Sequence, residues 1–105
     1  MLATNAALDA AALAHSLDQA AHRSMSHRGS DGSDAGQRIA AAGFSAGTWG
    51  ENVAAGYSSA SSVTAGWMGS SGHRANILNG SFTHIAVAYA DAADGTRFWT
   101  MVLAA

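Results

Sequence analysis

The sequence has no cysteine and no lysine, and it has a single glutamate, Glu51. Without cysteine the chain can form neither a disulfide nor a thiolate metal site, and it offers no cysteine nucleophile. Charged residues make up only 11% of the chain and the net charge is −2. The basic composition of nucleic-acid-binding proteins is therefore missing, and we expect no nucleic-acid partner.

Long hydrophobic segments are also missing. No apolar run approaches the ~18 residues that a membrane span requires, so we expect no such span. The first ten residues, MLATNAALDA, contain no basic residue. They therefore do not have the form of an intact signal peptide.

The length of 105 residues predicts one domain over residues 1–105. About half of the residues are hydrophobic, but many of these are alanine, which contributes little burial per residue. We therefore expect the large aromatic side chains to supply much of the core, among them Trp49, Trp67 and Trp99.

Helices are predicted mainly in the first half of the chain. Apolar residues at helical spacing predict a helix over residues 5–25, with Asn5 or Thr4 as its N-cap. A Gly-, Ser- and Asp-rich loop follows, and then a short helix over 35–43 that Ser33 or Asp34 caps and Gly43 ends. A third helix is expected at 63–69, and residues 70–80 are interpreted as a loop with a short helical turn.

Strands are predicted mainly in the second half. Residues 84–90 and 96–104 have strand character and are separated by the turn DAADG, so they predict a β-hairpin. Within residues 44–58 the segment ENVAAGY is read as a strand or an extended segment. Helices first and strands last indicate an α+β class rather than a regular βαβ alternation.

Six titratable side chains are candidates for chemistry, but they are spread along the chain and their spacing does not show that they meet. No HExxH helix, GxSxG elbow or P-loop is present. The segment GSDGSDAG lacks the alternating acidic ligands and terminal glutamate of a calcium loop. On residue type and position alone, most of these side chains are expected to be structural. The candidates are His15, His22, His27, Glu51, His73 and His84.

Four segments in order resemble the CAP superfamily, also called the SCP or CAP/PR-1 domain, in its disulfide-free bacterial branch. They are HSLDQAAHRSMSHRGSDGS, GENVAAG, VTAGWMGSSGHRANILNGSFTHIAVAYA and GTRFWTMVLA. The resemblance implies a three-layer α-β-α sandwich with a central, largely antiparallel sheet. The family usually has an earlier helix before the region that matches Leu2, and this helix is absent here, because the domain was either trimmed or is a minimal form. A minimal form would leave one face of the sheet less covered, which favours association with another chain, so a monomer or a weak homodimer is expected.

The same resemblance implies a cleft in which two histidines and two acidic residues bind a divalent cation. His27, Glu51 and His73 match three of these positions. The fourth acidic residue is missing, because residues 68–71 read Met-Gly-Ser-Ser. Two imidazoles and one carboxylate suit Zn²⁺ by ligand type. Glu51 is then a metal ligand, a catalytic base, or the group that orients a histidine.

A purely structural role for these residues stays open. A buried Glu51 needs hydrogen-bond partners, and two nearby histidines would supply them without a metal. Asn52 is expected to pair with backbone at a turn. His15 and His22 are interpreted as partly buried or surface helix residues, and His84 as facing solvent or a strand neighbour.

Three functions are compatible with the sequence. The resemblance favours a secreted, extracellular binding module for a lipid, sterol or protein ligand. The second is a metal-dependent, peptidase-like hydrolase that uses Glu51 with His27 and His73. The third is an extracellular scaffold with a vestigial cleft. The missing acidic residue argues against hydrolysis, because acid–base chemistry usually needs a second group with a separate pKa. Whether the chain is an enzyme stays open at this point.

Overall fold

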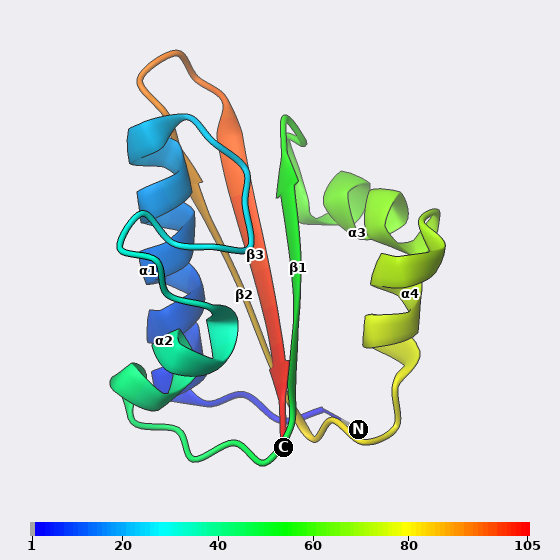
Figure 1. Cartoon of the computed structure of the whole chain (residues 1–105). Coiled ribbons are helices and arrows are strands. Elements are labelled where there is room, and N and C mark those ends of the chain that lie inside the picture. The colour runs from blue at the N-terminus through cyan, green and yellow to red at the C-terminus, as the bar shows by residue number, and fades with distance from the viewer. Residues whose placement is uncertain (1) are drawn as a thin grey trace.

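A computed structural model describes residues 2–105 and places a β-sheet between two layers of helices (Figure 1). Helices α1 and α2 cover one face of the sheet, and α3 and α4 cover the other. The predicted α-β-α sandwich is confirmed. The elements, in chain order, are α1 (Ala6–His22), α2 (Ala35–Ala42), β1 (Trp49–Ala55), α3 (Ala60–Met68), α4 (Ser71–Leu78), β2 (His84–Asp91) and β3 (Arg97–Ala104).

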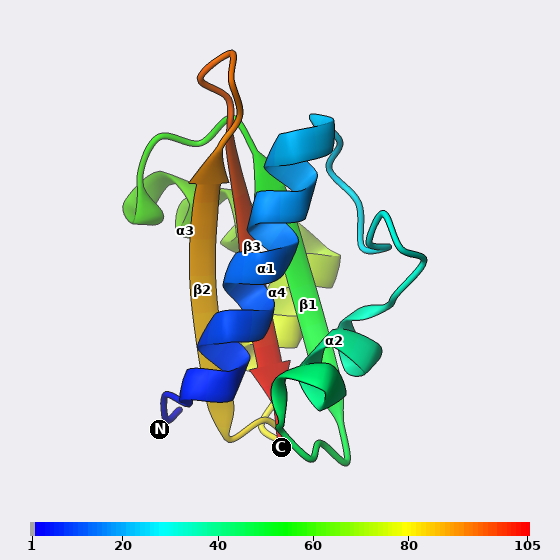
Figure 2. The same cartoon turned by 90° about the vertical axis from the view of Figure 1, so that its left-hand side faces the viewer.

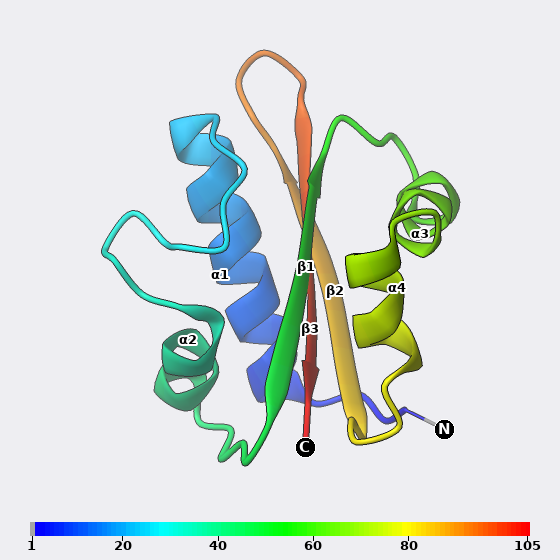
Figure 3. The same ribbon diagram turned by 45° about the vertical axis from the view of Figure 1, so that its right-hand side comes forward.

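The sheet has the order β1-β3-β2, and both neighbouring pairs are antiparallel. The predicted hairpin is therefore confirmed as β2 and β3, and β1 pairs with the other side of β3. Glu51 lies opposite Val102 in this register. Because β3 is the central strand, it is buried along nearly its whole length. Strand β1 is an edge strand that lies between the two helical layers (Figure 3), and its successive side chains point to opposite faces of the sheet.

Local signals set the ends of the first two helices. The Asn5 side chain accepts from the backbone N–H groups at the start of α1, as an N-cap residue does. Helix α1 ends at His22 rather than at residue 25, because Arg23 adopts a left-handed conformation with φ of 48°. Helix α2 begins with a capping box between Asp34 and Gln37 and ends at Gly43, whose φ is 104°.

The second helical layer differs more from expectation. Helix α3 begins at Ala60 rather than at residue 63, because Ser59 caps it through the backbone N–H of Ser62. The segment expected to be a loop with a helical turn is instead a regular helix, α4. None of its residues is fully buried. Its sequence, SGHRANIL, accordingly has no apolar stripe at helical spacing from which a helix is predicted.

Each face of the sheet has its own apolar core. Toward α3 and α4, Trp67 and Trp99 pack with Phe82, Met101 and Leu103. Toward α1 and α2, a second cluster joins the helices to the sheet; it consists of Leu8, Ala12, Ile39, Ala86, Val102 and Ala104. Figure 2 shows α1 lying across β2 and β3 on this face.

Two of the three tryptophans expected in the core lie there, and the third does not. Trp67 and Trp99 are 2% and 3% exposed, but Trp49 is 43% exposed. Trp49 is the first residue of edge strand β1, where no helix covers its ring completely.

Within residues 2–105, no helix is long and apolar enough to cross a membrane.

Candidate functional site

Glu51 is the centre of a polar cluster on edge strand β1. Its side chain is only 2% exposed, although a buried carboxylate is costly unless it is paired. Both of its oxygens have partners: Oε1 lies 2.9 Å from Nδ1 of His27, and Oε2 lies 2.6 Å from Nη2 of Arg38. The carboxylate is therefore satisfied by protein groups alone.

Arg38 joins three parts of this cluster. It extends from α2, which the capping box and Gly43 hold in place. Besides Glu51, its guanidinium donates to the backbone carbonyls of His27 and Ser33, at 3.0 and 2.9 Å. Its side chain is 12% exposed. A guanidinium in this position neutralises the buried carboxylate and fixes the loop between α1 and α2.

The loop that carries His27 is also held from α1. Nε2 of His15 lies 2.6 Å from the carbonyl of Ser26, and Oε1 of Gln19 accepts from the N–H of Ser26 at 3.2 Å. The backbone N–H and the carbonyl of Ser26, the residue before His27, are thus both anchored. His15 is 1% exposed and so is fully buried rather than partly buried. Its Nδ1 is buried without a hydrogen-bond partner in the described part of the chain.

Asp18 anchors the same loop further along. Its carboxylate accepts from the backbone N–H of Ser30 at 2.8 Å and from the Ser30 hydroxyl. These hydrogen bonds favour the charged form, and they hold the pKa of Asp18 below its ordinary value. His22 lies beside Asp18 on the surface. A surface position was one of the two expected for His22.

Asn52 connects β1 to the opposite helical layer. It is completely buried, and its Nδ2 donates to the backbone carbonyl of His73 at 3.1 Å. Asn76 in turn donates to Oδ1 of Asn52 at 3.0 Å. Asn52 therefore has a structural role, as expected. It lies within strand β1, however, and its hydrogen bonds are to α4 rather than to a turn.

The structure brings two of the three predicted ligand residues together. His27 and Glu51 are hydrogen-bonded. His73 lies on α4 and is half-buried, and the bond that joins it to β1 uses its backbone carbonyl. Within residues 2–105, no three His, Cys, Asp or Glu side chains are grouped so that they hold a metal ion.

The arrangement of donors does not fit the predicted zinc site. Each oxygen of Glu51 already accepts one hydrogen bond, one from the Arg38 guanidinium and one from Nδ1 of His27, so Glu51 is placed to orient His27 rather than to bind the ion directly. Arg38 also supplies the positive charge that a cation would bring. Zinc binding by His27, His73 and Glu51 stays a prediction that requires these side chains to rearrange.

His27 has the geometry of an oriented imidazole. Glu51 accepts from Nδ1, which leaves Nε2 as the free ring nitrogen, and the side chain is 63% exposed. A carboxylate that fixes a histidine tautomer is one component of acid–base sites. In the described residues, however, no serine or threonine hydroxyl is hydrogen-bonded to His27, so the nucleophile of such a site is not in place.

Sequence reasoning missed Arg38 and Gln19 as site residues, and it interpreted His15, one of the six candidates, only as a partly buried or surface helix residue. One signal was available for Arg38, because it is the only charged residue between positions 35 and 50. A lone cation and a lone glutamate in apolar surroundings are natural partners. No comparable signal existed for His15 or Gln19. His84, expected at solvent or a strand neighbour, bonds Thr83 and packs edge-on against Phe44.

Comparison with known proteins identifies related chains. The family model CAP, described as the cysteine-rich secretory protein family, matches residues 1–103. The uncharacterized protein YkwD of Bacillus subtilis (strain 168) is 47% identical over 58 residues, which are 55% of this chain and 21% of that protein. The matched part thus spans only a minor share of the length of this relative.

Two solved structures resemble the fold over almost the whole chain. The first is an extracellular protein containing a SCP domain from Bacillus anthracis str. Ames, with a TM-score of 0.87 and 30% identity over 99% of this chain and 33% of that one. The second is an outer surface protein from Borrelia burgdorferi, with a TM-score of 0.89 and 19% identity over 98% of this chain and 76% of that one. The second likeness concerns the fold alone.

Proposed function

The chain belongs to the CAP family, the cysteine-rich secretory protein family, and on that premise we propose that it is an extracellular binding module. Among the chains it resembles, the SCP-domain protein that is 30% identical is described as extracellular. The observation that carries the proposal is the state of Glu51. Both of its oxygens are occupied by Arg38 and His27, so it serves to hold His27 in place.

The exposed part of the cluster is the recognition surface. His27 projects from a loop that Arg38, Gln19 and His15 fix from two helices. Its free ring nitrogen can accept from a ligand when the ring is neutral, or donate when it is protonated. A side chain that is fixed before binding loses little conformational freedom on binding, and this contributes to affinity.

The character of the surface favours a protein ligand over a sterol or fatty acid. Five grooves in the described residues are each lined in part by charged or amide side chains. A sterol buries most of its surface in a predominantly apolar pocket. An exposed imidazole surrounded by polar groups matches the polar, partly solvated contacts of protein–protein interfaces better.

Hydrolysis is the second candidate, and the hydrogen bond between Glu51 and His27 favours it. An oriented imidazole can transfer protons. Catalysis by Glu51 itself would require the carboxylate to leave Arg38. A screen with peptide and ester substrates, with and without Zn²⁺, tests this candidate. Turnover that Glu51→Gln abolishes would replace the binding proposal with the hydrolase.

Site-specific photo-crosslinking tests the binding proposal directly. A photoreactive residue at Arg28, an exposed neighbour of His27, is compared with one at Thr64, which is exposed on α3. In cells that export the chain, we expect crosslinks to one protein from position 28 and not from position 64. His27→Ala should reduce them at least about 5-fold, the loss of roughly one good hydrogen bond. Crosslinks only to lipid, or equal crosslinks from both positions, would contradict the proposal.

A further inference from the structure

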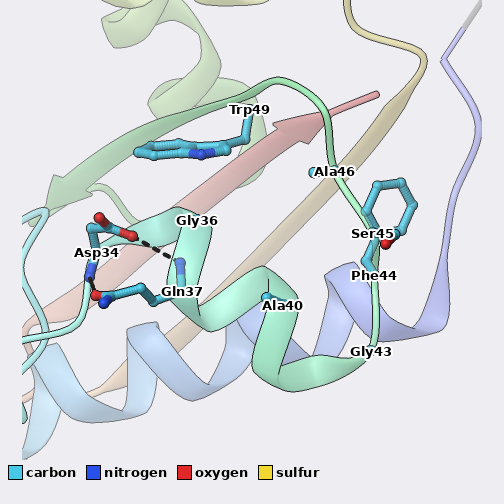
Figure 4. Close-up of a pocket in the computed structure, with 9 residues that line it drawn as sticks. All are labelled: Asp34, Gly36, Gln37, Ala40, Gly43, Phe44, Ser45, Ala46 and Trp49. Atoms are coloured by element: carbon cyan, nitrogen blue, oxygen red, sulfur yellow. Dashed lines mark hydrogen bonds between the residues drawn. The ribbon is translucent and has the colours of Figure 1, made fainter.

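A second surface, which combines an aromatic ring with polar groups, lies on the same side of the sheet as His27, at the first residue of β1. The indole of Trp49 rests on Gly36 of α2: a Cβ added at Gly36 would lie 2.5 Å from Nε1 and 2.7 Å from Cε2 of the ring. Only glycine permits this approach. Figure 4 shows the ring nearly edge-on, with α2 below it. One face of the indole is therefore packed against α2, although Trp49 is 43% exposed.

Trp49 forms one wall of an open groove of about 580 Å³. Helix α2 forms the opposite side, with Gln37 and Ala40, and the segment that leads from α2 into β1 closes one end (Figure 4). This volume lies within the range of small-molecule sites, about 300–1,000 Å³. It is also compatible with one or two sugar rings.

Several polar groups of the groove have bonding capacity to spare. The capping box uses Oδ1 of Asp34 and Oε1 of Gln37. In the described part of the chain, Oδ2 of Asp34, Nε2 of Gln37 and the hydroxyl of Ser45 have no hydrogen-bond partner. The groove thus combines one aromatic wall with a hydrogen-bond acceptor, a donor, and a hydroxyl that is both.

We propose that this groove binds a neutral glycan, with one pyranose ring packed against the part of the Trp49 indole that Gly36 leaves uncovered. A pyranose has an apolar face of C–H groups and a rim of hydroxyls. The C–H groups carry partial positive charge and suit the electron-rich face of an indole, and the hydroxyls match Asp34, Gln37 and Ser45. This site is distinct from the His27 surface and does not depend on its function.

A cationic ligand is the main alternative, and the geometry favours it less. Recognition of a quaternary ammonium group uses several aromatic faces around the cation. Here the second aromatic side chain of the groove, Phe44, packs edge-on against His84 at 5.3 Å. The carboxylate of the groove, Asp34, already accepts from a backbone N–H at the start of α2, which partly balances its charge.

The test uses cellotetraose and chitotetraose as probes and follows the indole N–H signals by NMR. Trp67 and Trp99 donate their indole N–H to Val53 and Tyr57, so the third signal, from Trp49, is the reporter. We expect a saturable shift of this signal with at least one probe. Trp49→Ala should weaken binding at least about 5-fold, the loss of one aromatic stacking contact.

Gly36→Ala is the sharper variant, because it removes no polar or aromatic group and only pushes the indole away from α2. It should also weaken binding several-fold. Gly72→Ala is the matched control, since an added Cβ there meets nothing within 4 Å, and it should bind as the original chain does. His27→Ala should leave glycan binding unchanged.

Three outcomes would overturn the proposal. They are the absence of a saturable shift with either probe, binding that persists unweakened in Trp49→Ala, and binding of a choline or trimethyl-lysine probe in place of the oligosaccharides. None of these outcomes affects the crosslinking test at position 28. A failure of glycan binding is therefore distinguishable from a failure of the proposed function.

Discussion

Arg38 and Glu51 form the one ion pair in residues 2–105 whose two side chains are both largely buried, at 12% and 2% exposed. The pair joins α2 to β1 and also fixes the backbone of His27. Removal of one member leaves the other charge buried and unpaired, which costs far more than loss of an exposed pair.

Arg38→Met should therefore lower the free energy of unfolding by about 2–4 kcal/mol. Urea unfolding at neutral pH measures this change. Arg74→Met is the matched control, because Arg74 is exposed, and it should change stability by less than about 0.5 kcal/mol. The double variant Arg38→Met/Glu51→Gln should recover part of the loss, since the buried charge is then gone. Equal losses of stability in Arg38→Met and Arg74→Met would contradict the structural role of the pair.

Zinc titration tests whether His27 and His73 bind a metal ion or have only a structural role. Because Arg38 already neutralises Glu51, we expect calorimetry at neutral pH to give no stronger Zn²⁺ binding to the original chain than to His27→Ala/His73→Ala. Saturable binding that disappears in the double variant would instead favour the predicted three-ligand site. It would also mean that Glu51 exchanges its guanidinium partner for the metal.

Asn52 should control the local stability of α4. The helix has no fully buried residue and no side-chain N-cap bond, and Asn52 bonds both its backbone and Asn76. Asn52→Ala should cost about 1–3 kcal/mol, because it leaves buried partners unsatisfied. Hydrogen exchange should accelerate in α4 more than in α1. Arg74→Ala, at an exposed residue of α4, serves as the control and should leave exchange in α4 nearly unchanged.

The pKa of Asp18 supplies a pH-dependent prediction. Hydrogen bonds from Ser30 lower this pKa, so they stabilise the fold when the carboxylate is charged in both states. The contribution is present above the ordinary value of about 3.9 and is lost as pH falls through the lower, folded-state pKa. Ser30→Ala should raise the pKa of Asp18 in an NMR titration.

The stability difference between the original chain and Ser30→Ala should be constant between about pH 5 and 7 and shrink below about pH 4. Ser81→Ala, at an exposed serine, should show no such pH dependence. A difference between the original chain and Ser30→Ala that stays constant down to about pH 2 would mean that Ser30 acts through packing rather than through the carboxylate.

The sequence predicted the elements that local signals define. The cap at Asp34, the left-handed Gly43 and the turn between β2 and β3 are each encoded within a few residues, so the structure confirms them. Helix α4 was missed because its stabilising contacts come from a distant residue, Asn52. Sequence periodicity contains no information about a contact of that kind.

The candidate site shows the same division. Resemblance to the family identified His27 and Glu51, and the structure joins them. Arg38 was missed because its role depends on how α2 packs against β1. The exposure of Trp49 was missed because tryptophan is usually buried, whereas this ring lies at the first residue of an edge strand, where Gly36 of α2 covers only part of it.

The contact between Gly36 and Trp49 also links two positions that are 13 residues apart in the chain. A side chain at position 36 and an indole at position 49 in this orientation exclude one another, so the two positions cannot diverge independently. Relatives that keep tryptophan at the start of this strand should keep glycine at the matching helix position. Relatives that replace the tryptophan should vary freely at the helix position.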